Sequence, residues 1–278
     1  MNIRIIAMDV DGTLYNSEKK ITPATKAALL EAQNKGIRLI IASGRPTPGV
    51  INIARELEMD KHHGLLVCFN GSRVVDCETG EILFNQSMTV EEGKAVLEHM
   101  KKFDQLYPMI DRGDFMYVND AYSTIEHNGT RQIVRSEAHG NNYKVCEIDD
   151  LAAFADFPLN KILTAATPSY LQAHHEEMYA PFKDTLNGMF TSAFYFEFTA
   201  KGIDKAKALD TVLRPMGYLP EEMMAFGDGH NDASMLQYSG LAIAMDNAVQ
   251  ALKDIADDVT LSNDEDGIAA SLMKYQII

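Results

Sequence analysis

The sequence predicts an α/β protein in which a Rossmann-like parallel sheet forms a core that carries an inserted α+β domain. Short runs of branched apolar residues alternate with helical segments near both ends of the 278-residue chain. Two acidic, glycine-containing stretches, 9–13 and 227–232, each follow such a run directly. From about residue 86 the order of expected elements changes to helix, strand, strand, which indicates the insertion.

The composition is that of an ordinary globular protein, with 46% hydrophobic and 23% charged residues. The net charge of −15 disfavours nucleic acid or an anionic membrane as partner, because both require a basic face. An anionic substrate therefore needs a local positive site. The composition makes no prediction of the oligomeric state.

We expect a cytoplasmic protein. The chain has no apolar run long enough to span a bilayer, and its N-terminus lacks the pattern of a signal peptide. Cys68, Cys77 and Cys146 are odd in number and show no metal-ligand spacing, so we expect reduced thiols.

The first strand is expected at residues 3–8, and it leads directly into Asp9 and Asp11. Side chains two apart on an extended backbone project from the same face, and Gly12 permits a turn after them. Such a carboxylate pair suits Mg²⁺, or it can divide attack on phosphorus and proton transfer between its members. A plain strand followed by an Asp-Gly turn explains these five residues equally well.

A second anion-binding element is expected after the next strand. The helix from Thr22 to about Asn34 and the strand 37–42 complete a strand-helix-strand unit, so the two strands are expected to be parallel. A hydroxyl, a glycine and an arginine follow the second strand: Ser43, Gly44 and Arg45. Ligands bind at this end of parallel strands, although a surface loop with a solvated arginine fits the same residues.

The domain boundaries are expected at residues 1–85 and 192–278 for the core and at 86–191 for the inserted cap. Asn70-Gly71 predicts a hairpin just before the first boundary. The cap is expected to hold an antiparallel sheet with helices on one face. Residues 119–142 are polar and show the weakest pattern.

The C-terminal part returns to the core pattern. Asp204 is expected to cap a helix that ends near Leu213, and the strand 223–226 runs into the acidic stretch 227–232. Asn247 is expected to cap a helix over 248–256. Because the carboxyl ends of parallel strands share one edge, both acidic stretches converge there with a hydroxyl and a lysine. The converging set is Asp9, Asp11, Ser43, Lys205, Asp228 and Asp232, which is what phosphoryl transfer requires.

These motifs resemble those of the haloacid dehalogenase superfamily, and within it the Cof-type phosphatases with a large inserted cap. The resemblance covers nearly the whole chain. Its four motifs are Asp-Val-Asp-Gly-Thr at 9–13, Ala-Ser-Gly-Arg at 42–45, Lys-Gly-Ile-Asp-Lys at 201–205 and Gly-Asp-Gly-His-Asn-Asp at 227–232. Phe-Asn-Gly-Ser at 69–72 and Ala-Met-Asp-Asn-Ala at 244–248 are similar to further family signatures.

The resemblance implies a Mg²⁺-dependent phosphoric monoester hydrolase that acts on a small phosphorylated metabolite through a phosphoaspartate. It makes Asp9 the nucleophile, while Asp11 protonates the leaving alcohol and then activates water. It assigns Mg²⁺ to the Asp9 carboxylate, the Asp11 main-chain carbonyl and Asp228, with Asp232 supporting the metal's water shell.

The resemblance also assigns the phosphoryl group to Ser43 and Lys205, with the backbone of Gly44 and the side chain of Asn231. Lys205, and not Lys201, occupies the family's motif position. Arg45 is a candidate substrate contact, and a structural salt bridge explains it equally well. His230 and Asp246 depart from the usual family pattern, and the second departure leaves the role of Asn247 open.

Two other functions remain as alternatives. A sugar phosphomutase has a similar core and cap, but it needs a cationic clamp in the cap. The basic residues of this cap are scattered: Arg112, Arg131, Arg135, Lys144 and Lys161. A non-catalytic sensor of a phosphometabolite has no need for the proton carrier Asp11. The chain also lacks a Gly-x-x-x-x-Gly-Lys-Ser/Thr loop, which disfavours a P-loop nucleotide enzyme.

Overall fold

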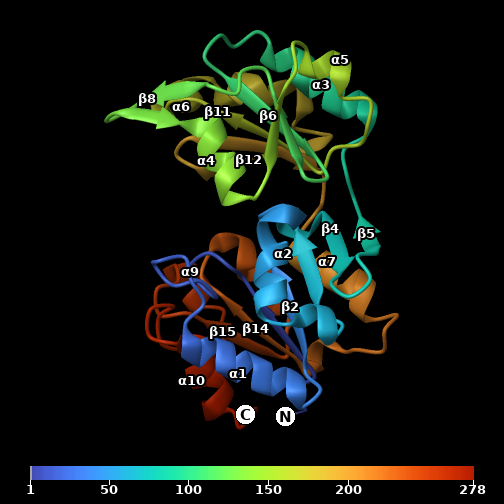
Figure 1. Cartoon of the computed structure of the whole chain (residues 1–278), viewed down its shortest axis with the longest axis vertical. Helices are drawn as coiled ribbons and strands as arrows, with labels where there is room; N and C mark the ends of the chain where they lie inside the picture. The colour runs from blue at the N-terminus through green and yellow to red at the C-terminus, as the bar shows by residue number, and fades with distance from the viewer. Residues whose placement is uncertain (1) are drawn as a thin grey trace. The chain divides into compact units, whose positions relative to one another are not determined.

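The computed structural model describes residues 2–278 and divides the chain into two compact units (Figure 1). Unit 1 comprises the residues up to Asn85 together with Asp204–Ile278, and unit 2 comprises Gln86–Ile203. Unit 2 is therefore an insertion in the sequence of unit 1. The α/β class with an inserted α+β domain is confirmed.

Unit 1 is built on an eight-stranded sheet with the order β16-β15-β14-β1-β2-β3-β4-β5. Its first six strands in that order are parallel: β16 (Asp258–Val259), β15 (Leu241–Ala244), β14 (Met223–Gly227), β1 (Ile5–Met8), β2 (Arg38–Ala42) and β3 (Leu65–Cys68). The hairpin expected at Asn70-Gly71 joins β3 to the antiparallel strands β4 (Arg73–Asp76) and β5 (Ile82–Asn85). The central strand β1 lies between β14 and β2, which brings both ends of the chain into one sheet.

Helices cover both faces of this sheet and bury an apolar cluster on each. One face carries α1 (Pro23–Asn34), α2 (Thr47–Glu56) and α10 (Gly267–Lys274), of which α1 and α10 lie side by side in Figure 1. The other face carries α7 (Lys205–Leu213), α8 (Ala233–Tyr238) and α9 (Gln250–Lys253). Short 3₁₀ turns lie at Met59–Lys61, Phe69–Gly71, Pro220–Glu222 and His230–Asp232.

The helix caps were partly predictable. The Thr22 hydroxyl accepts a hydrogen bond from the backbone N–H of Thr25, and Asp204 accepts one from Lys207, so both expected caps are confirmed. The expected cap at Asn247 is wrong, because the last helix before α10 begins only at Gln250 and Val249 precedes it. The side chain of Asn247 has a different role, described below.

Unit 2 holds a six-stranded sheet with the order β10-β7-β6-β11-β13-β12. The strands are β6 (Tyr107–Arg112), β7 (Phe115–Val118), β10 (Lys144–Glu147), β11 (Lys161–Ala165), β12 (Leu186–Ser192) and β13 (Tyr195–Ala200). All neighbours are antiparallel except β10 and β7. The sheet is therefore mixed at one edge.

Helices lie on both faces of the unit 2 sheet, so the expectation of helices on one face is wrong. The helices α3 (Val90–Met100), α5 (Leu151–Phe154) and α6 (Pro168–Tyr179), followed by the 3₁₀ turn Ala180–Phe182, pack on one face. The weakly patterned stretch forms the hairpin β8 (Thr124–Glu126) and β9 (Thr130–Gln132) and the helix α4 (Ile133–Gly140), which pack on the other. Ile133, Val134 and Ala138 give α4 its short buried stripe.

The second junction between the units lies after Ile203, not after residue 191 as expected. The strand β13 pairs with β11 and β12 in the unit 2 sheet, so it belongs to the insertion. The sequence pattern predicts a strand near 194–199 in the series of cap strands, but the expected boundary at residue 191 falls before it.

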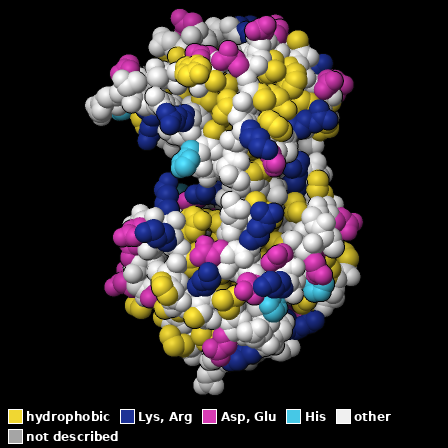
Figure 2. Space-filling model, in the orientation of Figure 1, with side chains coloured by type: hydrophobic (Ala, Val, Ile, Leu, Met, Phe, Trp, Pro, Cys, Tyr) yellow, Lys and Arg dark blue, Asp and Glu magenta, His cyan; other side chains and the backbone are white. Residues whose placement is uncertain are grey.

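Acidic and basic side chains are interspersed on the visible face of each unit in Figure 2. No helix within residues 2–278 is long and apolar enough to cross a membrane. The three cysteines are free thiols; Cys68 and Cys77 are buried and Cys146 is partly exposed.

Candidate active site

The site is assembled at the carboxyl ends of β1, β2 and β14 in unit 1. Asp9 follows β1 and is only 6% exposed, and its backbone N–H donates to the carbonyl of Phe226 in β14 (3.1 Å). The loop after Asp9 folds back on itself, with the N–H groups of Leu14 and Tyr15 bonded to the carbonyls of Asp9 and Val10. This local closure holds the Asp9 carboxylate at the sheet edge.

The two acidic loops lie in direct contact, as their positions at one sheet edge predict. A Cβ atom on Gly12 would stand 2.4 Å from Oδ2 of Asp228, and the φ of +86° also favours glycine there. The hydroxyl of Thr13 donates to Oδ1 of Asp228 (2.7 Å). Gly12 therefore gives the first loop its turn and leaves room for the carboxylate of the second.

Lys205 lies at the centre of the site. Its Nζ donates to Oδ1 of Asp9 (2.7 Å), to Oδ1 of Asp232 (2.6 Å) and to the carbonyl of Ala42 at the end of β2 (2.6 Å). The residue is 1% exposed and is the first residue of α7. These three bonds account for all three N–H groups of the ammonium, so the lysine is fixed in one position.

Asp232 connects the lysine to the fourth motif. Its Oδ1 accepts from Lys205, and its Oδ2 accepts from the backbone N–H groups of Asp228 and Gly229 (3.0 Å each). It is fully buried. Both oxygens are thus occupied within the protein, which suits a residue that holds the Asp228 loop in place.

The site carries more negative than positive charge. Burial raises the pKa of Asp9 to about 7. The Lys205 ammonium lowers this pKa, and the nearby Asp232 and Asp228 carboxylates raise it. Burial and the charge of Asp232 raise the pKa of Asp228 to about 6, against the lowering effect of the Thr13 hydroxyl. Burial lowers the pKa of Lys205, but the Asp9 and Asp232 carboxylates raise it by more.

This electrostatic imbalance and the donor set fit a hard divalent cation. Oxygen atoms of Asp9, Asp228 and Asp232 lie within 4.8 Å of one another. A cation among the carboxylate oxygens would offset both the burial and the mutual repulsion that raise the pKa values of Asp9 and Asp228. Asp9 and Asp228 are the better direct ligands, since the oxygens of Asp232 already accept bonds from Lys205 and two amides.

Asp11 is more exposed, and it pairs with Arg45. The guanidinium donates from Nε to Oδ2 (2.7 Å) and from Nη2 to Oδ1 (2.6 Å), and it also lies over the ring of Tyr15. The Asp11 side chain remains 52% exposed. The structure therefore places Arg45 on the proposed proton carrier, in the salt bridge that the sequence left as an open alternative.

The remaining expected phosphoryl contacts gather around a loop that the sequence analysis did not include in the site. Ser43 is 2% exposed, and its carbonyl accepts from the backbone N–H of Asn70 (3.0 Å). The Asn70 side chain stands against Gly44, and its Oδ1 accepts from Nδ2 of Asn231 (3.0 Å). In the sequence, Asn70 signals a hairpin and belongs to the Phe-Asn-Gly-Ser stretch that resembles a family signature, and neither feature predicts its bond to Asn231.

Asn247 fixes the first acidic loop from outside. Its Nδ2 donates to the carbonyl of Gly12 (2.8 Å), and its Oδ1 accepts from the backbone N–H of Asn263 (3.0 Å). The carbonyl of Asp228 accepts from the N–H of Val249 two residues later (3.0 Å). An asparagine before a helical pattern signals a cap, and no local signal pointed to this long-range bond.

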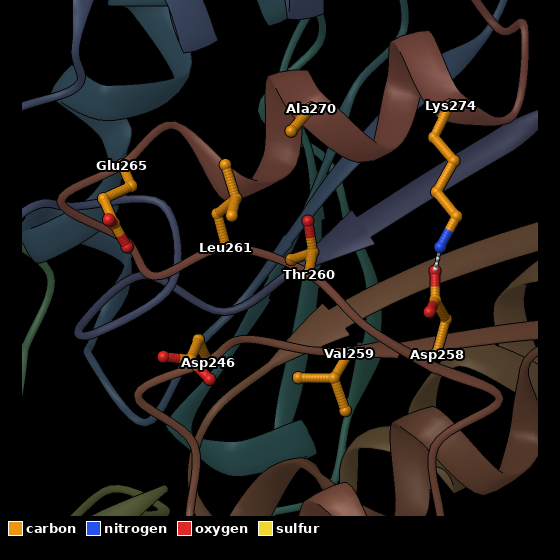
Figure 3. Close-up of a pocket in the computed structure, with 8 residues that line it drawn as sticks. All are labelled: Asp246, Asp258, Val259, Thr260, Leu261, Glu265, Ala270 and Lys274. Atoms are coloured by element: carbon orange, nitrogen blue, oxygen red, sulfur yellow. Dashed lines mark hydrogen bonds and ion pairs between the residues drawn. The ribbon is translucent and has the colours of Figure 1, made fainter.

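Asp246 and His230 do not join the carboxylate cluster. Asp246 lies 3.4 Å from Lys253 and lines a pocket of about 350 Å³ near α10, together with the Asp258–Lys274 ion pair (Figure 3). Its other lining residues are Val259, Thr260, Leu261, Glu265 and Ala270. His230 is exposed on the turn that carries Asn231 and Asp232.

Known proteins resemble this chain in sequence and in fold. The model of the haloacid dehalogenase-like hydrolases matches residues 6–272. A haloacid dehalogenase-like hydrolase from Bacteroides thetaiotaomicron is 30% identical, with a TM-score of 0.91 over 98% of this chain and 99% of its own. A subclass IIB sugar phosphatase of the superfamily is 27% identical, with a TM-score of 0.78 over 99% and 100% of the two chains.

A curated relative is similar along its whole length. The 5-amino-6-(5-phospho-D-ribitylamino)uracil phosphatase YcsE of Bacillus subtilis is 28% identical over 99% of this chain and 96% of its own. The expected class of enzyme, a phosphoric monoester hydrolase, is confirmed by the family match and the relatives' names. The chain thus belongs to the haloacid dehalogenase-like hydrolases.

Proposed function

We propose that this phosphatase is Mg²⁺-dependent and hydrolyses small phosphorylated metabolites, sugar phosphates or similar phosphomonoesters, through a phosphoaspartate on Asp9. The observation that carries the proposal is the Lys205 ammonium held between the buried Asp9 and Asp232, with Asp228 beside them. One lysine cannot neutralise three carboxylates, so the site favours a divalent cation. A bound Mg²⁺ would supply positive charge to the carboxylates and to a phosphoryl oxygen.

Asp9 is suited to nucleophilic attack because its position is fixed and its carboxylate is poorly solvated. Oδ1 accepts from Lys205, which leaves Oδ2 to form the bond with phosphorus while the bond to the leaving alkoxide breaks. Lys205 then balances the charge of the phosphoryl group as well as that of Asp9. Ser43, the Gly44 backbone and Asn231 complete the expected phosphoryl contacts.

Asp11 is suited to proton transfer because its side chain is partly exposed, unlike that of Asp9. It gives a proton to the leaving oxygen and later takes one from the water that hydrolyses the phosphoaspartate. Both of its oxygens are bonded to Arg45 in the structure. Each of these oxygens keeps a second lone pair on which it can carry the proton.

We assign substrate selection to unit 2 as an inserted cap, in keeping with the resemblance. A mutase would need free cations there, yet the five candidate basic residues named in the sequence analysis have other partners. Arg112 lies over Phe157, Arg131 over Phe194 and Lys144 over Phe115, while Lys161 pairs with Glu197 (2.9 Å). Arg135 donates to Gln132. These contacts support hydrolysis over phosphoryl return to a sugar.

Phosphate release from an aryl phosphate, with and without Mg²⁺, tests the metal requirement. We expect release that depends on Mg²⁺ and stops in excess EDTA; undiminished release in EDTA would contradict the metal assignment. Hexose monophosphates, with and without a catalytic amount of hexose bisphosphate, test the alternative. Bisphosphate-dependent isomer interconversion with little free phosphate would replace the phosphatase by a mutase.

A further inference from the structure

The loop Phe69–Gly71 has an unusual backbone at the edge of the site. Three consecutive residues are in the left-handed region, with φ values of +52° for Phe69, +56° for Asn70 and +101° for Gly71. Only glycine adopts this region freely, asparagine tolerates it, and a bulky residue such as Phe69 does so at a cost. Such conformations persist where surrounding contacts impose them, and they are common at functional sites.

The contacts that hold this loop come from three motifs of the proposed site. The N–H groups of Phe69 and Asn70 donate to the carbonyls of Arg45 and Ser43 (3.0 Å each). A Cβ atom on Gly71 would stand 2.2 Å from the carbonyl oxygen of Asp204, so the loop lies directly against the residue before Lys205. The loop is thus wedged between the residues that are expected to hold the phosphoryl group.

The Asn70 side chain links two of these elements. Its Oδ1 accepts from the Asn231 amide, and its Nδ2 stands 3.0 Å from where a Cβ on Gly44 would lie. Within residues 2–278, no hydrogen bond uses Nδ2 as a donor, and Asn70 is partly exposed. The Asn70 amide thus has its acceptor bound within the protein and its N–H groups unused, so it can donate to an anion.

We infer that Asn70 is a substrate-binding residue of this site: its Oδ1 orients Asn231, and its Nδ2 donates to an oxygen of the bound phosphoryl group beside Gly44. This inference rests on the proposed function. It also explains the strained backbone, since a relaxed conformation would turn the Asn70 side chain away from Gly44 and Asn231.

Substitutions at Asn70 separate the side chain from the backbone. Asn70→Gly removes the amide and keeps the left-handed backbone, so we expect an unchanged Tm. We expect kcat/KM and the affinity for orthovanadate, a phosphate analogue, to fall roughly 10- to 100-fold, the usual effect of losing a hydrogen bond to a charged group. Asn70→Asp keeps the acceptor for Asn231 but sets a carboxylate against the anion, so its affinity should fall further than that of Asn70→Gly.

The matched control is Asn142→Gly in unit 2, an exposed asparagine that also has a positive φ (+55°). It should leave orthovanadate binding and turnover unchanged. Wild-type affinity and kcat/KM in Asn70→Gly would overturn the inference, and so would wild-type affinity in Asn70→Asp. Should Asn70→Gly fail to fold, Asn70→Asp carries the test.

Calorimetric titration with orthovanadate in Mg²⁺ separates this inference from the proposed function. Wild-type protein that binds orthovanadate but releases no phosphate would sink the phosphatase proposal, and the affinity ratio of the variants would still decide the role of Asn70. Active wild-type protein with equally active Asn70→Gly would overturn the role of Asn70 alone.

Discussion

The molecule contains two buried lysine–carboxylate clusters, one in each unit, and they differ in charge balance. In unit 2, Lys161 pairs with Glu197 at 2.9 Å on neighbouring strands, and their side chains are 12% and 5% exposed. In unit 1, Lys205 bonds to both Asp9 and Asp232, and Asp228 adds a third carboxylate. The ion pair of the first cluster joins Lys161 to Glu197, whereas in the second cluster one lysine bonds two carboxylates with a third beside them.

The protonation behaviour follows this difference. Burial lowers the pKa of Lys161, but the charges of Glu197, Glu137 and Asp111 raise it overall. The pKa of Lys205 is also raised by its carboxylate partners. The pKa of one of these partners, Asp9, is itself raised to about 7. Burial is the main cause of this raised pKa, and the Asp232 and Asp228 carboxylates add to it, while the single Lys205 ammonium offsets only part of it. We therefore interpret the unit 2 pair as structural and the unit 1 cluster as functional.

The largest effect is expected for Asp9→Asn. The variant keeps the shape of the side chain but loses the nucleophile, so turnover of an aryl phosphate with Mg²⁺ should fall roughly 10³- to 10⁶-fold. Asp114→Asn, at an exposed carboxyl of unit 2, is the control and should retain turnover. Near-wild-type turnover in Asp9→Asn would show that another group attacks phosphorus.

Loss of the Lys161–Glu197 ion pair should lower the free energy of unfolding and leave turnover unchanged. Lys161→Met leaves Glu197 buried without its ion-pair partner, and we expect a loss on the order of 3–5 kcal/mol of unfolding free energy in urea. The double variant Lys161→Met/Glu197→Leu should recover most of that loss. Lys144→Met, which removes an exposed lysine 3.9 Å from Asp114, is the matched control and should change stability by less than about 1 kcal/mol. An unchanged free energy of unfolding in Lys161→Met would contradict the interpretation of the unit 2 pair as structural.

Substitution of Lys205, unlike that of Lys161, should reduce catalysis. Lys205→Ala removes the cation that bonds Asp9, and the loss of transition-state stabilisation should be on the order of 2–4 kcal/mol in kcat/KM for an aryl phosphate. Lys201→Ala is the control, because the Lys201 ammonium donates to the carbonyl of Lys183 in unit 2. Equal losses in the two variants would refute the choice of Lys205.

The smallest effect is a pH dependence of the metal-free protein. Asp9 and Asp228 have pKa values of about 7 and 6 in the folded state, above the usual value of about 3.9 in an unfolded chain. Between about pH 4 and 7 the folded state therefore binds more protons, so its stability falls as the pH rises. Asp9→Asn should remove most of this pH dependence, because the pKa of Asp9 is raised further than that of Asp228.

Urea unfolding in EDTA at pH 5 and pH 8 measures this difference. The stability of Asp9→Asn relative to wild type should rise by on the order of 2 kcal/mol from pH 5 to pH 8. Saturating Mg²⁺ should abolish the trend in wild type, because the cation favours ionised carboxylates. A constant difference between the two proteins would mean that Asp9 does not hold a proton near neutral pH.

Much of the core was predictable because its signals are local. Apolar runs such as 3–8 and 37–42 are buried strands, and loops that follow parallel strands meet at one edge whatever the details of packing. The positions of Asp9, Ser43, Asp228 and Asp232 therefore followed from topology, whereas Lys205 begins α7 after β13, a strand of unit 2. Cap residues such as Thr22 also have a short-range signature, since the bonded group lies three residues away.

Several features that the sequence did not predict depend on contacts between residues far apart in the chain. The bond of Asn247 to the Gly12 carbonyl spans 235 residues, and the bond of Asn70 to Asn231 spans 161, so no local pattern announces them. The helix α4 has only three buried residues among polar ones, which left it unrecognised. The expected cap boundary at residue 191 falls before the strand β13, whose pairing with β11 and β12 places it in unit 2.

The most direct test of the account is to trap the phosphoryl group on the protein. The enzyme is mixed with excess substrate and Mg²⁺, quenched during turnover and reduced with borohydride, which converts a phosphoaspartate to homoserine. We predict homoserine at position 9, seen by peptide mass spectrometry, in wild type with Mg²⁺ but not in EDTA. Homoserine at another aspartate, or phosphate release at full rate with position 9 unmodified, would contradict the assignment of Asp9 as the nucleophile.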